Sequence, residues 1–422
     1  MLSTYIELLQ TLQNLYFDHF PLMYKLPFEI RRTKGNGIRL SKVKRRNDRV
    51  VSLFPAFIFA SAVFLFIVAT RLRTPLVARP MGDAKMWGWF VLGIACFSGL
   101  VFYTLWMLVY QSDAIFMCNE IFRWEEELRK DSSQTKHIPV KATLLEKTVL
   151  LGFKLLVWMY YFVTPIDAAV TTFLTVDPLL PFFEFVLNMI PQLRKLLLFF
   201  AFNSEALFYF AMFLVRVGCV TVFLYEGFRL AAFCIGLTIL IGKVVVSYLS
   251  SVSRLTDTFQ ENIIQHGLWS HLKIYKVLPI IFQSLEAPMK STASLAIVAG
   301  TVAVSGCTFV VIKLHAVNDV YMTGFCLGVS VSAVILTKII LDTLANLDET
   351  SVKVLLQFRR LEILQKMGEP ERKIYLKELY YLKPIAIPVG LGTARFSRIT
   401  NNVKTTILMF MLENSINLLL AF

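Results

Sequence analysis

The sequence predicts an all-α polytopic membrane protein with seven transmembrane helices, a cytoplasmic N-terminus and an extracellular C-terminus. Three observations carry this prediction. The 422 residues are 56% hydrophobic and 17% charged, which is too apolar for a soluble protein of this size. Seven apolar stretches are long enough to cross a hydrocarbon core of about 30 Å. The lysines and arginines, which bring the net charge to +14, concentrate in loops that would share one side of the membrane.

The spans follow one another from residue 50 onward. We expect them at 50–70, 87–110, 148–172, 214–240, 291–314, 320–342 and 403–422. The apolar stretch 196–249 admits one long helix with a lead-in that lies along the membrane, or two spans that meet at Arg216. A single span keeps the basic loops 243–290 and 343–404 on the same side as the basic N-terminus. The positive-inside rule therefore favours one span and a total of seven.

The chain divides into four parts. These are a cytoplasmic segment (1–49), the first six helices with their loops (50–342), a cytoplasmic helical anchor region (343–402) and a pore-lining seventh helix (403–422). The basic cluster between Arg31 and Arg49 should face anionic lipid of the inner leaflet. No cleaved signal peptide is expected, because no apolar h-region follows a basic n-region. Pro178, Pro181 and Pro191 predict an irregular external loop before the fourth span.

The last span carries a polar stripe. Thr406, Phe410, Glu413 and Asn417 recur at i, i+4, i+7 and i+11, so they share one helical face. A carboxylate against lipid is costly, so this face should meet protein or water. In one interpretation it lines a pore between several copies, with Glu413 favouring cations, Asn417 adding amide oxygens, and Met409 or Phe410 forming a constriction. In the other, the helix packs inside its own bundle and Glu413 is hydrogen-bonded there.

This span resembles the seventh-span signature of the arthropod gustatory and odorant receptor superfamily. That signature reads Thr-Tyr, five hydrophobic residues, then Gln-Phe. Here Thr406-Ile407, Leu408 to Leu412 and Glu413-Asn414 keep the threonine and the spacing but replace the tyrosine, glutamine and phenylalanine. The helix and turn at 377–390 and the seven-span topology are similar to the same superfamily. The resemblance is to a gustatory-type, insect chemoreceptor-like bundle.

The resemblance implies a ligand-gated, non-selective cation channel in the plasma membrane. It would be a homotetramer, or a heterotetramer with a related receptor. The seventh spans would surround a central pore, and cytoplasmic helices would join the subunits. A small-molecule tastant or odorant would open the pore from a site in the outer half of each bundle.

A chemoreceptor pocket should be aromatic, with a few polar groups. The third span offers Trp158, Tyr161, Phe162 and Thr164, and the fifth and sixth offer Thr308 and Tyr321. Aromatic residues in spans also serve as packing residues or interface anchors, and that alternative stays open. Glu226 and Arg229 lie three apart in the fourth span and are expected to form a structural ion pair.

Two other function classes are alternatives, a G-protein-coupled receptor and a transporter of small solutes. A G-protein-coupled receptor would need an external N-terminus, an Asp-Arg-Tyr-like step and an Asn-Pro-x-x-Tyr step, and the sequence has none of these. A transporter usually has related halves around a charged site in mid-membrane. The sequence has no internal repeat, although Glu226 and Arg229 keep the transporter open. We expect no enzyme activity, cofactor, metal site or nucleic-acid partner, because no matching motif is present.

Overall fold

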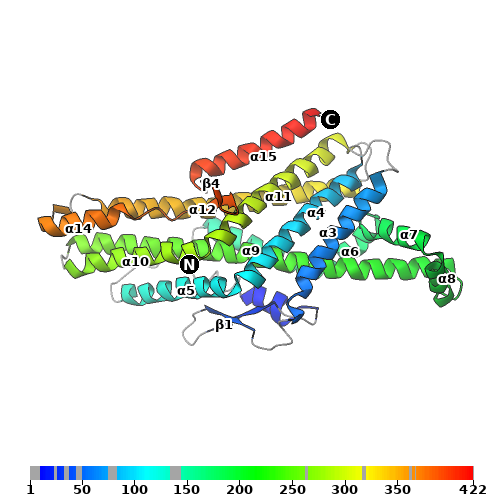
Figure 1. The fold of residues 1–422 in the computed structure, drawn as a ribbon, viewed down its shortest axis with the longest axis horizontal. Helices are drawn as coiled ribbons and strands as arrows, with labels where there is room; N and C mark the ends of the chain where they lie inside the picture. Colours follow the sequence, from blue (N-terminus) through cyan, green and yellow to red (C-terminus); the bar gives the residue numbers. More distant parts are fainter. Residues whose placement is uncertain are drawn as a thin grey trace.

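The computed structural model describes residues 10–22, 26–32, 38–43, 50–74, 83–133, 144–261, 265–315, 320–360, 364–365 and 367–421. Within these residues the chain forms an elongated bundle of helices (Figure 1). The helices are η1 (Asn14–Asp18), α3 (Phe54–Arg73), α4 (Ala84–Tyr103), η4 (Thr104–Val109), α5 (Gln111–Ser133), α6 (Leu144–Phe173), α7 (Leu179–Met189), α8 (Pro191–Phe200), α9 (Glu205–Glu261), α10 (Gln265–Ser284), α11 (Glu286–Lys313), α12 (Val320–Phe358), α14 (Glu369–Tyr380) and α15 (Asn401–Ala421). The strands are β1 (Phe28–Arg32), β2 (Ile38–Lys42), β3 (Pro388–Leu391) and β4 (Ala394–Arg398).

Among the described residues, seven helical segments are long and apolar enough to cross a membrane, as predicted. They are α3, α4 with η4, α6, α9, α11, α12 and α15. The ambiguous stretch 196–249 begins with the end of α8 and a turn, and from Glu205 onward it lies in α9, one continuous helix of 57 residues. The prediction of a single fourth span is therefore confirmed.

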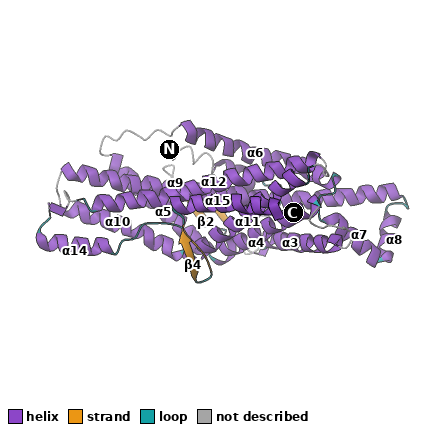
Figure 2. Cartoon of the chain, turned by 90° about the horizontal axis from the view of Figure 1, so that it is seen from above, coloured by secondary structure: helices purple, strands orange, loops and turns teal. Residues whose placement is uncertain are grey.

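The bundle has two unlike ends. A membrane needs only about 20 helical residues to be crossed, but α9 has 57 residues and α12 has 39. Their second halves continue past the other spans beside α5, α10 and α14 (Figures 1 and 2). We name this part the long-helix end. The opposite part, the short-loop end, holds the end of α3, the start of α4, the turn between α6 and α7, and the ends of α11 and α15.

The long-helix end is held together by buried tyrosines. The Tyr375 hydroxyl of α14 donates to the carbonyl of Phe358, at the end of α12, over 3.2 Å. The Tyr275 hydroxyl of α10 donates to the carbonyl of Lys383 over 3.1 Å. Lys276 of α10 also pairs with Glu378 of α14. Helices from three distant parts of the sequence are thus joined outside the spans.

Two short hairpins depart from the all-helical expectation. Strands β1 and β2 pair antiparallel from Phe28 opposite Lys42 to Arg32 opposite Ile38. The Asn119 amide of α5 holds this hairpin, because it bonds both the N–H and the carbonyl of Leu40, at 2.8 and 2.9 Å. The region expected only as a cytoplasmic basic segment therefore contains a β-hairpin.

The second hairpin, β3–β4, lies near the end of the region 343–402, which the sequence predicted to be helical. Gly392 has φ +55° at its turn, a conformation that glycine adopts without strain. The Ser294 hydroxyl of α11 bonds both the N–H and the carbonyl of Gly390, each at 2.8 Å. A side chain at Gly390 would collide with the carbonyl oxygen of Ala394. The hairpin therefore fixes the chain to α11 just before α15 begins.

The proline-containing loop before the fourth span is helical, which corrects the expectation of irregular structure. It forms α7 and α8, which break at Ile190 and Pro191. Pro181 lies in the first turn of α7, where a missing N–H breaks no intrahelical hydrogen bond. Only Pro178 and Pro191 act as helix boundaries.

A buried ion pair fixes the turn between α6 and α7. Arg216 of α9 donates from Nε to Asp177 Oδ2 at 2.9 Å and from Nη2 to the carbonyl of Thr172 at 3.2 Å. The side chains of Arg216 and Asp177 are 8% and 0% exposed. Trp89 of α4 donates its indole N–H to the neighbouring carbonyl of Val176. The turn is thereby tied to α4 and α9.

We predict that replacing Asp177 by leucine destabilises the protein by about 3 kcal/mol, because it leaves the Arg216 guanidinium buried without its carboxylate. Thermal unfolding in detergent should show a lower midpoint for Asp177→Leu. The double variant D177L/R216L should recover much of the loss, since it removes both charges. Equal midpoints for the wild type and both variants would contradict the structural role of this pair.

Candidate functional site

The start of α15 is fixed by polar contacts to its own bundle. The Thr400 hydroxyl accepts from the N–H of Val403 at 3.3 Å and caps the helix. Lys404 Nζ lies 2.9 Å from Asp342 Oδ1 of α12. Asn401 donates to Glu349 Oε2 of α12 at 3.0 Å. These bonds set where α15 begins and leave the rest of its orientation to apolar packing.

One face of α15 packs on α11. Ile407, Met411 and Ser415 are its buried residues and recur every four positions. The Ser415 hydroxyl lies 3.2 Å from that of Ser305 on α11. Gly300 of α11 leaves room for the Met411 side chain, because a Cβ there would lie 3.2 Å from Met411 Cε. Small residues on α11 thus let the two helices approach closely.

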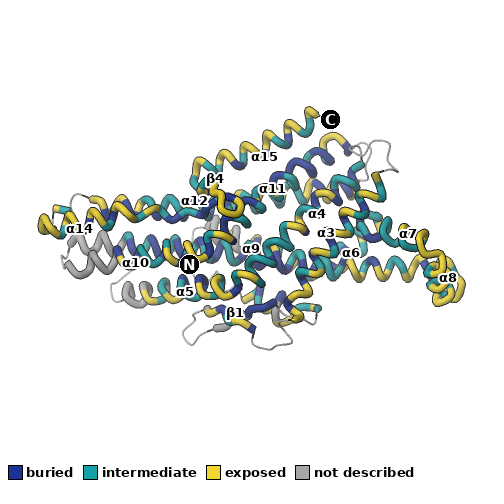
Figure 3. The backbone as a smooth tube through the Cα atoms, viewed as in Figure 1, coloured by how far each residue is buried: buried dark blue, intermediate teal, exposed yellow. Residues whose placement is uncertain are grey.

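The opposite face of α15 is exposed on the isolated chain. Every residue predicted to line a pore lies on it, namely Thr406, Met409, Phe410, Glu413 and Asn417. Figure 3 shows α15 along one edge of the bundle with few buried positions. Glu413 therefore does not lie inside its own bundle. The alternative that placed it there does not describe this chain.

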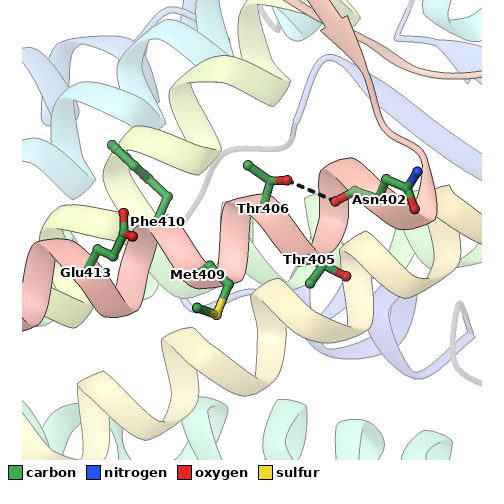
Figure 4. Close-up of a pocket in the computed structure, with 6 residues that line it drawn as sticks. All are labelled: Asn402, Thr405, Thr406, Met409, Phe410 and Glu413. Atoms are coloured by element: carbon green, nitrogen blue, oxygen red, sulfur yellow. Dashed lines mark hydrogen bonds between the residues drawn. The ribbon is translucent and has the colours of Figure 1, made fainter.

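A groove of ≈ 470 Å³ runs along this exposed face (Figure 4). It is lined by Asn402, Thr405, Thr406, Met409, Phe410 and Glu413. The hydroxyls of Thr405 and Thr406 each donate to a backbone carbonyl one turn earlier, at 3.1 Å. Such bonds satisfy a hydroxyl donor in apolar surroundings while its oxygen can still accept. The groove thus presents hydroxyl, amide and carboxylate oxygens, which are ligands suited to cations and water.

The exposed half of α15 has a mainly polar edge, which also carries Phe410, and a mainly apolar edge, which also carries Thr405. At about 100° per residue, Thr406, Glu413 and Asn417 fall on one side of the line opposite the buried face. Leu412 and Ile416 fall on the other side and are 53% and 45% exposed. Lipid or a second copy could cover the apolar edge while the polar edge faces water.

The predicted ligand-pocket residues of α6 lie on different sides of that helix. Trp158 and Phe162 are exposed and stack on each other, with ring centroids 5.5 Å apart. Thr164 is buried and donates to the carbonyl of Tyr160 in its own helix. Thr308 of α11 lies 3.1 Å from Ser330 of α12, hydroxyl to hydroxyl. Tyr321 is 71% exposed. The structure does not bring these residues together, so a shared pocket stays a prediction.

Tyr161 contacts a segment that sequence reasoning did not place. Its hydroxyl donates to the carbonyl of His19 at 2.5 Å, and its ring meets Tyr16 edge to face at 5.8 Å. Tyr16 in turn donates to the carbonyl of Val157 at 3.1 Å. The N-terminal residues around η1 therefore pack on α6. The aromatic composition of this amphipathic stretch was visible in the sequence, but its docking site was not.

Glu226 and Arg229 of α9 form a buried ion pair. Arg229 Nη2 donates to Glu226 Oε2 at 2.8 Å, and each side chain is 1% exposed. The Arg229 guanidinium also lies 4.0 Å from the centroid of the Phe20 ring, a cation–π distance. The contact with Phe20 joins the N-terminal segment to α9.

No protein-family model matches this chain, and no curated protein matches its sequence. Solved structures do share its fold. One is the insect olfactory receptor OR5 from Machilis hrabei in complex with eugenol, with a TM-score of 0.64 and 10% identity over 100% of this chain and 99% of that one. Another structure of that receptor gives a TM-score of 0.62 and 10% identity over 99% and 97% of the two chains.

This likeness shows the fold. The chain has the seven-helix fold of insect olfactory receptors and is a multi-pass membrane protein. The resemblance drawn from the seventh span predicted this fold, and the prediction is confirmed. At 10% identity the likeness does not extend to function.

We predict that Gly300→Leu destabilises the packing of α15. The larger side chain would displace Met411, and overpacking of this kind costs about 1 to 3 kcal/mol. Thermal unfolding in detergent should show a lower midpoint. Gly324→Leu on α12 is the matched control, because no atom lies within 4 Å of a Cβ built there. Identical unfolding midpoints for Gly300→Leu and Gly324→Leu would contradict the close packing of Met411 on Gly300.

Proposed function

We propose that this protein is a gustatory-type chemosensory receptor, a ligand-gated non-selective cation channel assembled as a tetramer around α15. The observation that carries the proposal is the exposure of Glu413 near the middle of a helix that crosses the membrane. A carboxylate at the centre of a bilayer costs roughly 3 kcal/mol or more. Sister copies that turn the same edge toward a shared, water-filled axis would relieve that cost.

The chemistry of the groove supports a cation path. A ring of Glu413 carboxylates would raise the local concentration of cations and repel anions. Asn417, one turn further toward the C-terminus, would add amide oxygens. Phe410 and Met409, toward the long-helix end, would form an apolar constriction that a gate could open or close. The hydroxyls of Thr405 and Thr406 would line the vestibule beyond it.

The proposed orientation places the long-helix end in the cytoplasm. Arg39 and Lys42 of the β1–β2 hairpin are exposed, and basic residues beside spans favour the cytoplasmic side. The short-loop end would face outside, where a tastant or odorant arrives. One solved protein of this fold is in complex with eugenol, which supports a small organic ligand for this chain.

Helix α11 is the proposed link between ligand and pore. It contacts α12 through Thr308 and Ser330 at 3.1 Å, and it carries α15 through Ser305 and Ser415 at 3.2 Å. A ligand that binds one arrangement of these helices better than the other would shift the population toward that arrangement. Movement of α11 would then move α15 with it.

We predict that Glu413→Lys suppresses ligand-evoked cation current or reverses the preference for cations over anions. The substitution replaces a ring of negative charges in the proposed pore by positive ones. Reversal potentials under asymmetric salt would measure the change. Glu184→Lys on α7 is the control, because it makes the same charge change at another exposed position and should leave selectivity unchanged. Unaltered selectivity in Glu413→Lys channels at the cell surface would remove Glu413 from the pore.

The proposed activity itself is tested by whole-cell recording from cells that express this chain alone. A panel of sugars, bitter compounds and volatile aromatics should contain at least one compound that evokes a cation current. A related subunit should be co-expressed if the chain is silent. Surface protein that gives no current with either arrangement across the panel would contradict the proposal.

A further inference from the structure

The helix α8 and its flanks form an apolar surface that the spans do not cover. Met189 ends α7, Ile190 lies between α7 and α8, and Phe202 follows α8; these three residues are 68%, 48% and 88% exposed. Within α8, Leu196, Phe199 and Phe200 are 52%, 69% and 69% exposed, and Leu196 and Phe200 lie one turn apart. No residue of α8 is buried. A contiguous exposed surface of this kind marks an interaction site.

The same helix carries two cations. Arg194 and Lys195 are exposed and, at about 100° per residue, point away from the row formed by Leu196 and Phe200. Within the described part of the chain neither residue forms an ion pair with a carboxylate. An apolar row beside unpaired cations is the pattern of a helix that lies in a membrane interface.

The position of α8 is consistent with this environment. Polar residues at the ends of three spans mark where the bundle meets the headgroups, namely Arg73, Asp83 and Lys313. Helix α8 lies at this same end (Figure 1). Helix α6 ends at the same part of the bundle and also exposes apolar residues, namely Ile166 and Phe173, which are 64% and 76% exposed.

In Figure 1, α8 lies at the lower right end of the bundle, whereas α15 runs along its upper edge. If α15 faces the tetramer axis, α8 faces the surrounding lipid and not a neighbouring subunit. The placement of α8 toward lipid and away from a neighbouring subunit rests on the proposed function. The other steps rest on the exposure and charge of α8 itself.

We propose that α8 is an interfacial helix that docks on the leaflet at the short-loop end. Leu196 and Phe200 enter the boundary between headgroups and acyl chains, and Arg194 and Lys195 contact lipid phosphates. Long basic side chains can reach the headgroups while the helix body stays in the apolar boundary. The helix thus anchors the α6–α9 connection to the membrane surface.

The test places one fluorophore on α8 in phosphatidylcholine nanodiscs. Cys219 is the exposed native cysteine among the six, so Cys219→Ala supplies the background for Phe200→Cys. Spin-labelled lipid should quench an environment-sensitive fluorophore at position 200 at least about twofold more strongly than the same fluorophore on Lys195→Cys. Soluble iodide should quench the fluorophore on Lys195→Cys more strongly than the one at position 200. If Phe200→Cys does not elute as the folded wild type, Leu196→Cys on the same face replaces it.

The outcomes separate the possible occupants of this surface. Iodide quenching without lipid quenching at position 200 would place α8 in water and overturn the proposal. Protection from both quenchers would place it against a second copy or another protein, which also overturns it. Adding R194E/K195E should reduce lipid quenching at position 200, and no reduction would contradict the phosphate contact. The labelling reads the depth of α8 whether or not the protein conducts, so its failure would not be a failure of the proposed channel.

Discussion

The cost of placing a carboxylate against hydrocarbon is the constraint on which the functional account depends. Glu413 lies near the middle of α15, and the bundle packs on the other side of that helix through Ile407, Met411 and Ser415. A lone chain in a bilayer would therefore expose Glu413 to acyl chains. The proposed assembly around α15 would let water reach this edge and exclude lipid from it.

The position of α15 depends in turn on α11. Three contacts along this one helix hold successive parts of the final segment. Ser294 holds the β3–β4 hairpin at Gly390, Gly300 makes room for Met411, and Ser305 meets Ser415. All three residues of α11 are small, so the backbones approach closely and a shift of α11 would be passed to α15. The contact between α11 and α15 therefore holds α15 in place and would also carry a movement of α11 to the proposed pore.

The fold class and the exposed face of α15 could be predicted because both are local properties. Hydropathy over about 20 residues identifies a span, and the 3.6-residue period identifies a face. The docking of Tyr16 on α6 and the hairpin beside Asn119 could not be predicted, because each depends on a partner distant in sequence. The candidate pocket residues were chosen by composition, which does not say where a side chain points. Trp158 consequently proved exposed, whereas Thr164 proved buried.

The most direct test of the account is the symmetry of the purified particle in lipid nanodiscs, imaged at a resolution that traces helices. The account predicts a tetramer with a central axis, in which the helix that ends the chain lies nearest that axis and turns its carboxylate toward it. A particle that stays monomeric, or one whose final helix lies at the outer rim against acyl chains, would contradict it.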